Sequence, residues 1–432
     1  MNYKESRLYI EHAQKYGSVL GLNNMEVMME RLGNPQDELQ FIHVAGTNGK
    51  GSVLAYVSTV LKEAGYQVGR YVSPTLFSYL ERIEINGEPV SEEIFAAQMT
   101  KVAKVVTEMV KEGLAHPTPF EIETAVAFLC FKELRCQIVA LETGMGGLLD
   151  ATNLITTTQI AVLTSISMDH MGFLGNTLAE IARNKAGIIK PGCHVVTTRQ
   201  KPEAMTVVEG TARRFKVPVH VADKDDALVE ESSCFGQKFL YGEEEYEISM
   251  AGVYQIENAV IALKVVEVLR ELGYEISGEA IHRGMKETVW GGRFSILDKS
   301  PVFVIDGAHN PDAALKLEAS IQEYFEGKTI YYIMGMFKDK DYDRVAQIAA
   351  PYAKEIMTIA TPKNERALPA EELAKTVRKY NSHVTAMQSL QDAVEVAYKK
   401  AKPEDVIIAF GSLSFLGEIS ELVKKRRKTE EK

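Results

Sequence analysis

Short apolar segments alternate with longer amphipathic segments along most of the chain. The apolar segments are rich in β-branched residues, whereas Val53, Val57, Val60 and Leu61 recur at the spacing of one helix face. Unbroken apolar runs of four or five residues are typical of strands buried on both faces of a parallel sheet. The predicted strands of the first half are residues 41–44, 137–141, 159–163 and 194–197. The pattern therefore predicts an α/β fold with a mostly parallel sheet.

The pattern changes twice in the second half of the chain. Residues 238–241 and 246–248 flank an acidic turn and predict an antiparallel hairpin, after which helical spacing returns from Gln255 to about Leu272. Residues 290–293 (WGGR) then interrupt the helical pattern and lead into a second series of strands. These predicted strands are residues 302–305, 330–333, 355–358 and 406–410. We therefore place a domain boundary near residue 297, between a larger domain at 1–297 and a smaller α/β domain at 298–432.

Composition narrows the class of protein. Lys and Arg total 49 against 59 Asp and Glu, a formal charge of −10, which argues against nucleic acid as the main partner. The four cysteines form no C-x-x-C pair, which fits a reducing compartment. The N-terminal residues do not resemble a signal peptide, and no run approaches the roughly 18 apolar residues of a membrane span. We expect a cytoplasmic protein that does not bind membranes, and a monomer because no heptad pattern is present.

A glycine-rich turn directly follows the first predicted strand. Residues 45–52 read AGTNGKGS and precede the predicted helix. Glycines at 46, 49 and 51 would let phosphate oxygens approach backbone N–H groups at the positive end of that helix, and Lys50 could bridge the outer phosphates. The spacing departs from G-x-x-x-x-G-K-[ST], because Gly46 lies only three residues before Gly49 and Gly51 separates Lys50 from Ser52. The strand and helix on either side nevertheless predict nucleotide binding.

Polar side chains follow two other predicted strands. Glu142 comes just after the strand at 137–141, and His170 comes a few residues after the strand at 159–163. Open α/β sheets place ligands at the carboxyl ends of their strands, and Mg²⁺ prefers oxygen ligands and water. Each side chain alone also fits an ordinary role, as a helix cap or a hydrogen-bonded surface group.

The motifs together resemble one family over most of the chain. The turn at 45–52 is similar to the phosphate loop of the folylpolyglutamate synthase and dihydrofolate synthase family, relatives of the cell-wall Mur ligases. Further matching motifs follow in the family's order between about residues 40 and 417. They are Ser73-Pro74, 81–83, 85–87, Phe120-Glu121, Glu142 with 146–147, 149–153, 169–170 with 174–175, 181–182 with 185–188, Gln255 with 258–259, 292–294, 306–311, 339–341 and 411–413.

The resemblance implies a P-loop, Mur-ligase-like ATPase domain at 1–297 and a Rossmann-like domain at 298–432 that contributes to nucleotide and glutamate binding. It implies two Mg²⁺ ions, one held by Ser73 and Glu142 and the other by Glu142 and His170. Lys185 would react with CO₂ to form a carbamate that serves as a further metal ligand. With Lys50, Glu142 and His170, it would be catalytic. The implied ATP-binding residues are Gly46, Thr47, Asn48, Gly49, Lys50, Gly51, Ser52, Asn258, Arg293, Asp306 and His309.

The family adds L-glutamate to a folate or dihydropteroate carboxylate through an acyl phosphate, and the same activity is expected here. His309 and Ser412 are candidates for the glutamate site. The sequence departs from the family at Thr75, where histidine is common, and at Leu148, where arginine is common; both positions belong to the expected acceptor site. The implied acceptor-binding residues are Pro74, Thr118, Pro119, Phe120, Glu121, Leu149, Asp150 and Ala151.

Two other functions remain open from the sequence. A Mur-like amide ligase would use the same phosphate chemistry on a cell-wall precursor or another acid. A non-catalytic ATP-binding switch would bind the nucleotide without forming an amide. Within the expected family, the sequence leaves open whether dihydropteroate, reduced folates or both are the acceptors.

Overall fold

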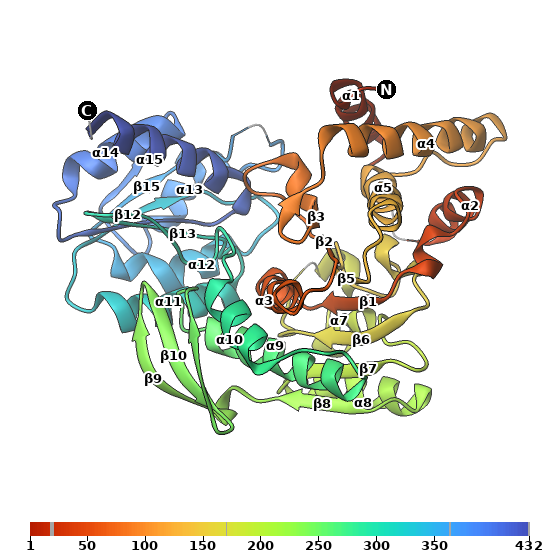
Figure 1. Cartoon of the computed structure of the whole chain (residues 1–432). Coiled ribbons are helices and arrows are strands. Elements are labelled where there is room, and N and C mark those ends of the chain that lie inside the picture. The colour runs from red at the N-terminus through yellow and green to blue at the C-terminus, as the bar shows by residue number, and fades with distance from the viewer. Residues whose placement is uncertain (18–20, 170, 363, 431–432) are drawn as a thin grey trace. The chain divides into compact units, whose positions relative to one another are not determined.

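The computed structural model describes residues 1–17, 21–169, 171–362 and 364–430, which form two compact units (Figure 1). The first unit comprises Met1–Ala227 and Glu257–Glu287, and the second comprises Leu228–Ile256 and Thr288–Lys432. The sequence-based boundary near residue 297 therefore lies inside the second unit, and the segment with the hairpin clusters with that unit. The function assigned to each domain stays a prediction.

A mostly parallel sheet forms the centre of the first unit. Its strand order is β4-β3-β2-β5-β1-β6-β7-β8. The strands from β2 to β8 in this order pair in parallel, whereas β3 pairs antiparallel with both β2 and β4. Its strands are β1 (Phe41–Ala45), β2 (Val68–Tyr71), β3 (Ile83–Ile85), β4 (Glu88–Pro89), β5 (Ile138–Glu142), β6 (Thr158–Leu163), β7 (His194–Thr198) and β8 (Val219–Ala222). The strands predicted from the apolar runs, β1, β5, β6 and β7, are confirmed.

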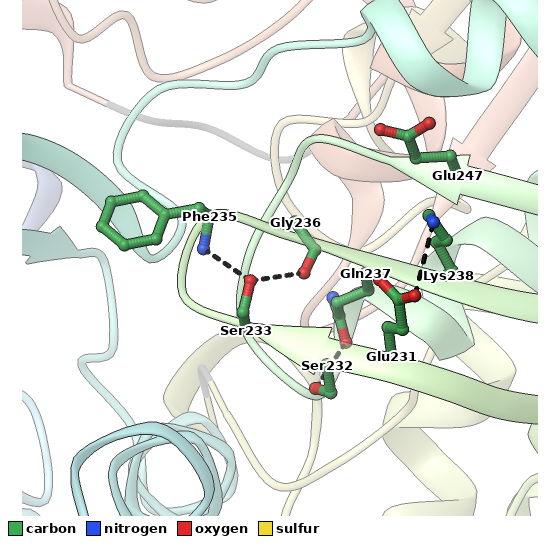
Figure 2. Close-up of a pocket in the computed structure, with 8 residues that line it drawn as sticks. All are labelled: Glu231, Ser232, Ser233, Phe235, Gly236, Gln237, Lys238 and Glu247. Carbon is green, nitrogen blue, oxygen red and sulfur yellow. Dashed lines mark hydrogen bonds and ion pairs between the residues drawn. The ribbon is translucent and has the colours of Figure 1, made fainter.

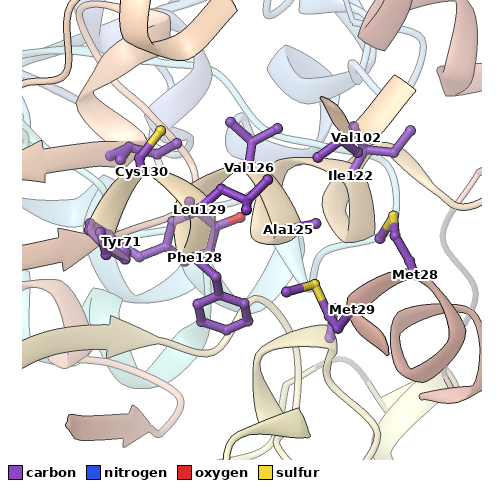
Figure 3. Close-up of a cluster of buried hydrophobic side chains, with 14 of the residues drawn as sticks. Met28, Met29, Tyr71, Val102, Ile122, Ala125, Val126, Phe128, Leu129 and Cys130 are labelled. Carbon is purple, nitrogen blue, oxygen red and sulfur yellow. The ribbon is translucent and has the colours of Figure 1, made fainter. Parts of the chain in front are cut away.

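Helices surround this sheet. One face, which carries Phe41, Val139 and Leu141, packs against α5 (Pro119–Glu133). Helix α5 packs in turn against α2 (Asn23–Arg31), which carries Met28 and Met29, and against α4 (Glu92–Lys111), which carries Val102 (Figure 3). The apolar side chains of this core remove surface from water, which is the main stabilising contribution to such a unit. The helices are α1 (Tyr3–Ala13), α2 (Asn23–Arg31), α3 (Lys50–Glu63), α4 (Glu92–Lys111), α5 (Pro119–Glu133), α6 (Met171–Leu174), α7 (Leu178–Ala186), α8 (Pro202–Phe215), α9 (Gln255–Glu271) and α10 (Gly278–Glu287).

Helix α3, which starts at the phosphate loop, packs closely against α10. Gly284 of α10 makes this approach possible, because a Cβ atom at that position would lie 2.5 Å from Val60 Cα. Both helices belong to the first unit, so this contact supports the helix that carries Lys50 at its first residue.

The second unit contains a small antiparallel sheet and a larger mixed one. The predicted hairpin is confirmed by β10 and β11, next to β9 in the order β11-β10-β9. The larger sheet has the order β12-β13-β17-β14-β15-β16, parallel except for β12. The strands are β9 (Ala227–Ser233), β10 (Gly236–Tyr241), β11 (Glu244–Ile248), β12 (Ser295–Lys299), β13 (Val302–Asp306), β14 (Ile330–Met334), β15 (Glu355–Thr358), β16 (Val384–Ala386) and β17 (Val406–Phe410), and the helices are α11 (Pro311–Phe325), α12 (Tyr342–Ala349), α13 (Ala370–Val377), α14 (Leu390–Lys400) and α15 (Leu416–Glu430).

Both units thus have the predicted α/β architecture. Over the part of the chain that the structure describes, no helix has both the length and the apolar character needed to cross a membrane.

The close approach of α3 and α10 leads to a stability prediction. Gly284→Ala should lower the free energy of unfolding by about 1–3 kcal/mol, because the added methyl group must displace the backbone of α3. Gly210→Ala in α8 is the matched control. No atom lies within 4 Å of a Cβ added there, so it should raise stability by up to about 1 kcal/mol. Urea unfolding of both variants measures the difference, and equal effects would show that the contact is unimportant.

Candidate active site

The phosphate loop joins β1 to α3 in the first unit. Gly49 is the N-cap of α3 and has φ of +90°, a conformation that favours glycine, and no side chain caps the helix. A Cβ atom at Gly46 would collide with Thr164, and one at Gly49 would collide with the side chain of Asn258. Gly51 and Ser52 lie buried in the first turn. The backbone amides of this turn are therefore presented at the positive end of a helix, as the sequence predicted.

The segment after β6 holds the loop in place. The backbone N–H of Thr47 donates to Ser165 O at 2.7 Å, and Thr47 Oγ1 donates to Ser167 O at 3.1 Å and accepts from Ser167 N at 3.0 Å. Ser165 Oγ also donates to Asn48 O at 3.3 Å. Sequence reasoning missed these positioning residues. The available signal was that serines directly follow a strand predicted to belong to the same sheet as β1.

Two lysines from different helices converge on one oxygen atom. Lys50 Nζ, on the first residue of α3, donates to Gly46 O at 3.3 Å and to Thr47 O at 3.4 Å. Lys185 Nζ, on α7, donates to the same Gly46 O at 2.7 Å. Lys185 and Gly46, which are 139 positions apart in the sequence, thus meet at the carboxyl end of β1.

The surroundings of Lys185 favour its neutral amine. The side chain is buried, and burial together with the nearby charge of Lys50 lowers its pKa from 10.5 to about 7, against a smaller opposing effect of Asp169 and Asp150. A lysine with this pKa is partly unprotonated at neutral pH and can act as a nucleophile.

The loop after β5 fixes the position of α7. Leu148 N donates to Asn184 O at 2.7 Å, and Asn153 Nδ2 donates to Leu148 O and to Gly187 O at 3.0 and 3.1 Å. Gly147 permits this approach, since a Cβ atom there would lie 2.8 Å from Asn184 O. The paired glycines at 146–147 therefore have a packing role that brings Lys185 toward the phosphate loop.

Glu142 brings a carboxylate to the same edge of the sheet. Its Oε1 lies 3.7 Å from Lys50 Nζ, and its Oε2 accepts a hydrogen bond from Ser73 N at 3.2 Å. Carboxylate and hydroxyl oxygens are ligands that suit Mg²⁺, so the buried carboxylate of Glu142 and the hydroxyl of the partly exposed Ser73 fit this ion. His170, the other predicted ligand, lies outside the described residues.

The predicted acceptor-binding residues have clear structural roles. Thr118 and Glu121 form a capping box at the start of α5, with Glu121 Oε2 accepting from Thr118 N at 2.7 Å, and Pro119 is the first residue of that helix. The Phe120 ring packs directly over Gly144, just after β5. These contacts place the start of α5 beside the carboxyl end of β5.

Asp150 organises the loop that contains Leu149 and Ala151. It accepts hydrogen bonds from Met145 N at 2.8 Å and from Thr152 N at 3.0 Å, and burial raises its pKa. Ala151 is buried and Leu149 is exposed. Pro74 lies in the loop after β2, where Glu81 accepts from Leu76 N and Phe77 N at 2.9 Å.

Exposed apolar side chains follow three of the parallel strands of the first unit, β2, β5 and β6. Large apolar residues are normally buried, so those exposed after the carboxyl ends of these strands are candidates for contact with an apolar ligand. They are Phe77 after β2, Leu148 and Leu149 after β5, and Met168 and Phe173 after β6. Sequence reasoning did not single out Phe77, Met168 or Phe173.

The remaining predicted residues belong to the second unit. Asp306 ends β13, and its carboxylate accepts from Tyr254 Oη at 2.7 Å and from Phe294 N at 2.8 Å. Arg293 lies against Gly307, and His309 Nδ1 lies 2.8 Å from Gly307 O. Ser412 accepts from Ser414 N at 3.3 Å and caps a short helical turn. Arg293, Asp306 and His309 therefore lie close together at the end of β13.

A hollow lies on the antiparallel sheet of the second unit (Figure 2). Lys238 Nζ lies 3.4 Å from Glu231 Oε1 there, and Ser233 Oγ donates to Gly236 O at 3.0 Å. None of the predicted site residues lines this hollow, and we assign it no part in the reaction.

Comparisons with known proteins agree with this arrangement. Residues 44–266 match the Mur ligase middle domain, and residues 292–413 match the Mur ligase glutamate ligase domain. The chain is 35% identical to the dihydrofolate synthase/folylpolyglutamate synthase of Bacillus subtilis, over 98% of this chain and 99% of that protein.

Solved structures extend the likeness to the whole fold. The Mycobacterium tuberculosis folylpolyglutamate synthase complexed with ADP and AMPPCP is 29% identical, with a TM-score of 0.88 over 98% of this chain and 99% of that one. Escherichia coli FolC in complex with DHPP and ADP is 27% identical, with a TM-score of 0.85 over 99% of each chain. The chain therefore belongs to the Mur ligase family and, within it, to the folylpolyglutamate synthase/dihydrofolate synthase family.

Proposed function

We propose that the chain is an ATP-dependent ligase that adds L-glutamate to the carboxylate of a folate or dihydropteroate through an acyl phosphate. The observation that carries this proposal is the meeting of Lys50, Lys185 and Glu142 at the carboxyl end of β1, next to a glycine-rich helix start. The cationic side chain of Lys50 and the carboxylate of Glu142 beside backbone amides suit phosphoryl transfer. Names of relatives that include both activities support the same reaction.

In the first step, the acceptor carboxylate attacks the γ-phosphorus of ATP, the bond to the β,γ-bridging oxygen breaks, and ADP leaves. Amides of residues 47–51 would hold the phosphates, and Lys50 would turn from Gly46 O toward the transferring group, whose charge it stabilises. Asn258 lies beside Gly49 and would contact the nucleotide from α9. Structures of relatives with ADP and AMPPCP support ATP as the nucleotide.

Mg²⁺, when bound, supplies positive charge that neutralises the phosphate oxygens. Glu142 and Ser73 would hold one ion, and Glu142 and His170 would contribute to holding a second. Lys50 lies 3.7 Å from Glu142, so a cation at this carboxylate would also favour movement of the lysine toward the phosphates.

We further propose that Lys185 is carbamylated. Its neutral nitrogen would attack the carbon of CO₂ and lose a proton, which leaves an anionic carbamate on the buried side chain. The burial that lowers its pKa to about 7 supports this reaction, since only the neutral amine reacts. The change also replaces repulsion between Lys50 and Lys185 by attraction and adds an oxygen ligand for the metal.

In the second step, the amine of glutamate attacks the acyl carbon, the carbon–oxygen bond to phosphate breaks, and the nitrogen loses a proton. His309 and Ser412 of the second unit are the proposed glutamate-binding residues, and Arg293 and Asp306 would contribute to nucleotide binding. The exposed apolar residues Phe77, Leu148 and Phe173 support a flat, aromatic acceptor such as a pteridine.

The activity is tested by mass spectrometry after incubation with ATP, Mg²⁺ and glutamate. Dihydropteroate or tetrahydrofolate should gain a glutamate residue, whereas a cell-wall nucleotide precursor should not react. Amide formation only on the cell-wall precursor would contradict the proposal.

Lys50→Ala should lower turnover by roughly a hundredfold or more, because a charge contact in the transition state contributes about 3 kcal/mol. Lys62→Ala, on an exposed residue of the same helix, is the control and should retain full turnover.

Lys185→Ala should abolish ligation while thermal unfolding stays close to that of the parent. Protein equilibrated with ¹³C-bicarbonate should show a carbamate signal by ¹³C NMR that is absent from this variant. Lys190→Ala is the matched control, since Lys190 is another partly buried lysine whose pKa burial lowers. A carbamate signal that persists in Lys185→Ala, or turnover equal to that of the parent, would refute the role of Lys185.

Phe77→Ala should raise the KM for the pteridine acceptor at least about tenfold, because burying a phenyl ring is worth roughly 1.5–3 kcal/mol. The KM for ATP should not change. Phe235→Ala is the control: Phe235 is 55% exposed in the second unit and Phe77 is 52% exposed in the first, so their surface exposure is closely matched. Steady-state kinetics with each substrate varied separately distinguish the two. An equal effect on both KM values would rule out a contact specific to the acceptor.

A further inference from the structure

Three potential metal ligands meet on the first unit, away from the phosphate loop. His194 is the first residue of β7, His220 lies in the neighbouring edge strand β8, and Glu271 is the last residue of α9. One ligand atom from each side chain lies within 4.8 Å of the others. None of the residues proposed for ligation belongs to this group.

The strand register explains why the two histidines meet. His220 pairs with Val196, so His194 and His220 are diagonal neighbours with side chains on the same face of the sheet. His194 Nδ1 lies 3.1 Å from His220 Nε2, and the ring planes differ by only 11°. The two nitrogens thus share one hydrogen bond, with a proton on one of them.

We propose that His194, His220 and Glu271 form a site for a divalent transition-metal ion of the zinc class. Two imidazoles and one carboxylate are a donor set that zinc accepts, with a fourth position left for water. The ion would replace the shared proton, and the imidazole that carried this proton would carry it on its other nitrogen instead.

The distances require a small movement of one ligand. Zinc lies about 2 Å from its nitrogen and oxygen ligands, so two ligand atoms can be at most about 4 Å apart. The two imidazole nitrogens already meet this limit. Glu271 is exposed at the end of a helix and can rotate inward, because little packs against its side chain.

The charged side chains around His220 partly offset one another's effect on a bound cation. The side chains of His194 and His220 are only partly exposed. Lys264 also faces His220 and would oppose a cation, but it is paired with Glu267, which faces the same ring. Glu271 adds a further negative charge.

The site lies at the opposite end of the strands from the proposed chemistry. His194 is level with Ile160, and Ile160 is level with Ile42, near the start of β1, whereas the phosphate loop follows the end of β1 at Ala45. An ion here would link α9 to the two outer strands of the sheet without contacting the phosphate loop. The inference is therefore independent of the proposed ligase activity.

Isothermal titration with Zn²⁺, in buffer containing excess Mg²⁺ to occupy the phosphate site, tests the proposal. A Cys234→Ser background removes the partly exposed thiol as a competing ligand. We expect one ion per chain, with at least tenfold weaker binding in His220→Gln and weaker binding in Glu271→Gln. His12→Gln, an exposed histidine on α1, should bind as the parent does.

A Co²⁺ absorption spectrum that is lost in His220→Gln, but kept in His12→Gln, would show that imidazole is a ligand. Thermal unfolding without metal checks that each variant is folded, and Glu271→Gln, at an exposed position, keeps the test decisive if His220→Gln unfolds. No saturable binding by the parent, or equal affinity in parent and Glu271→Gln together with an unchanged Co²⁺ spectrum in His220→Gln, would overturn the proposal. The histidines would then form only a hydrogen-bonded pair.

Discussion

The carbonyl oxygen of Gly46 is the point on which the proposed chemistry depends. It accepts hydrogen bonds from Lys50 at 3.3 Å and from Lys185 at 2.7 Å, so two ammonium groups compete for one partial negative charge in a largely buried place. Glu142, 3.7 Å from Lys50, offsets part of the repulsion between the two lysines, and the repulsion that is left, together with burial, favours loss of a proton from Lys185. The site is therefore prepared for a phosphate group at Lys50 and for a neutral, reactive amine at Lys185.

The order of the strands makes this meeting possible. Because β1 lies between β5 and β6, the segments after all three strands reach the same edge of the sheet. The segment after β6 holds Thr47, the last residue of β5 is Glu142, and the loop after β5 holds α7 against the phosphate loop. Gly284 has a supporting role farther away, because it lets α10 pack closely behind α3. The local geometry at Gly46 thus depends on contacts distributed over the first unit.

Much of this fold was predictable from the sequence, and the reasons are local. β1, β5 and β6 are continuous apolar runs, and the start of α3 is marked by glycines. β2 was missed because Gly69 and Arg70 interrupt its apolar pattern, although both are buried. The sequence predicted the antiparallel hairpin but not that it belongs to the second unit. That assignment depends on contacts between residues distant in sequence, and the spacing of apolar residues along the chain does not reveal such contacts.

The candidate site was predictable in part for the same reason. Lys50 and Glu142 stand next to recognisable strand ends, whereas Lys185 was singled out only through resemblance to a family. Its contact with Gly46 joins residues far apart in sequence, and only the packing of α7 against Leu148 brings it there. Thr118 and Glu121 were also singled out as substrate-site residues through this resemblance. In the structure they form a capping box that fixes the start of α5.

A crystal structure with a non-hydrolysable ATP analogue and Mg²⁺ would show directly how the two lysines at Gly46 O respond to the nucleotide. The account predicts phosphates against the amides of residues 47–51, with Lys50 Nζ moved from Gly46 O to a phosphate oxygen. It also predicts Mg²⁺ on Glu142 and additional density at Lys185 Nζ for a carboxyl group. Phosphates bound away from the loop, or an unmodified Lys185 still on Gly46 O with metal and nucleotide in place, would contradict it.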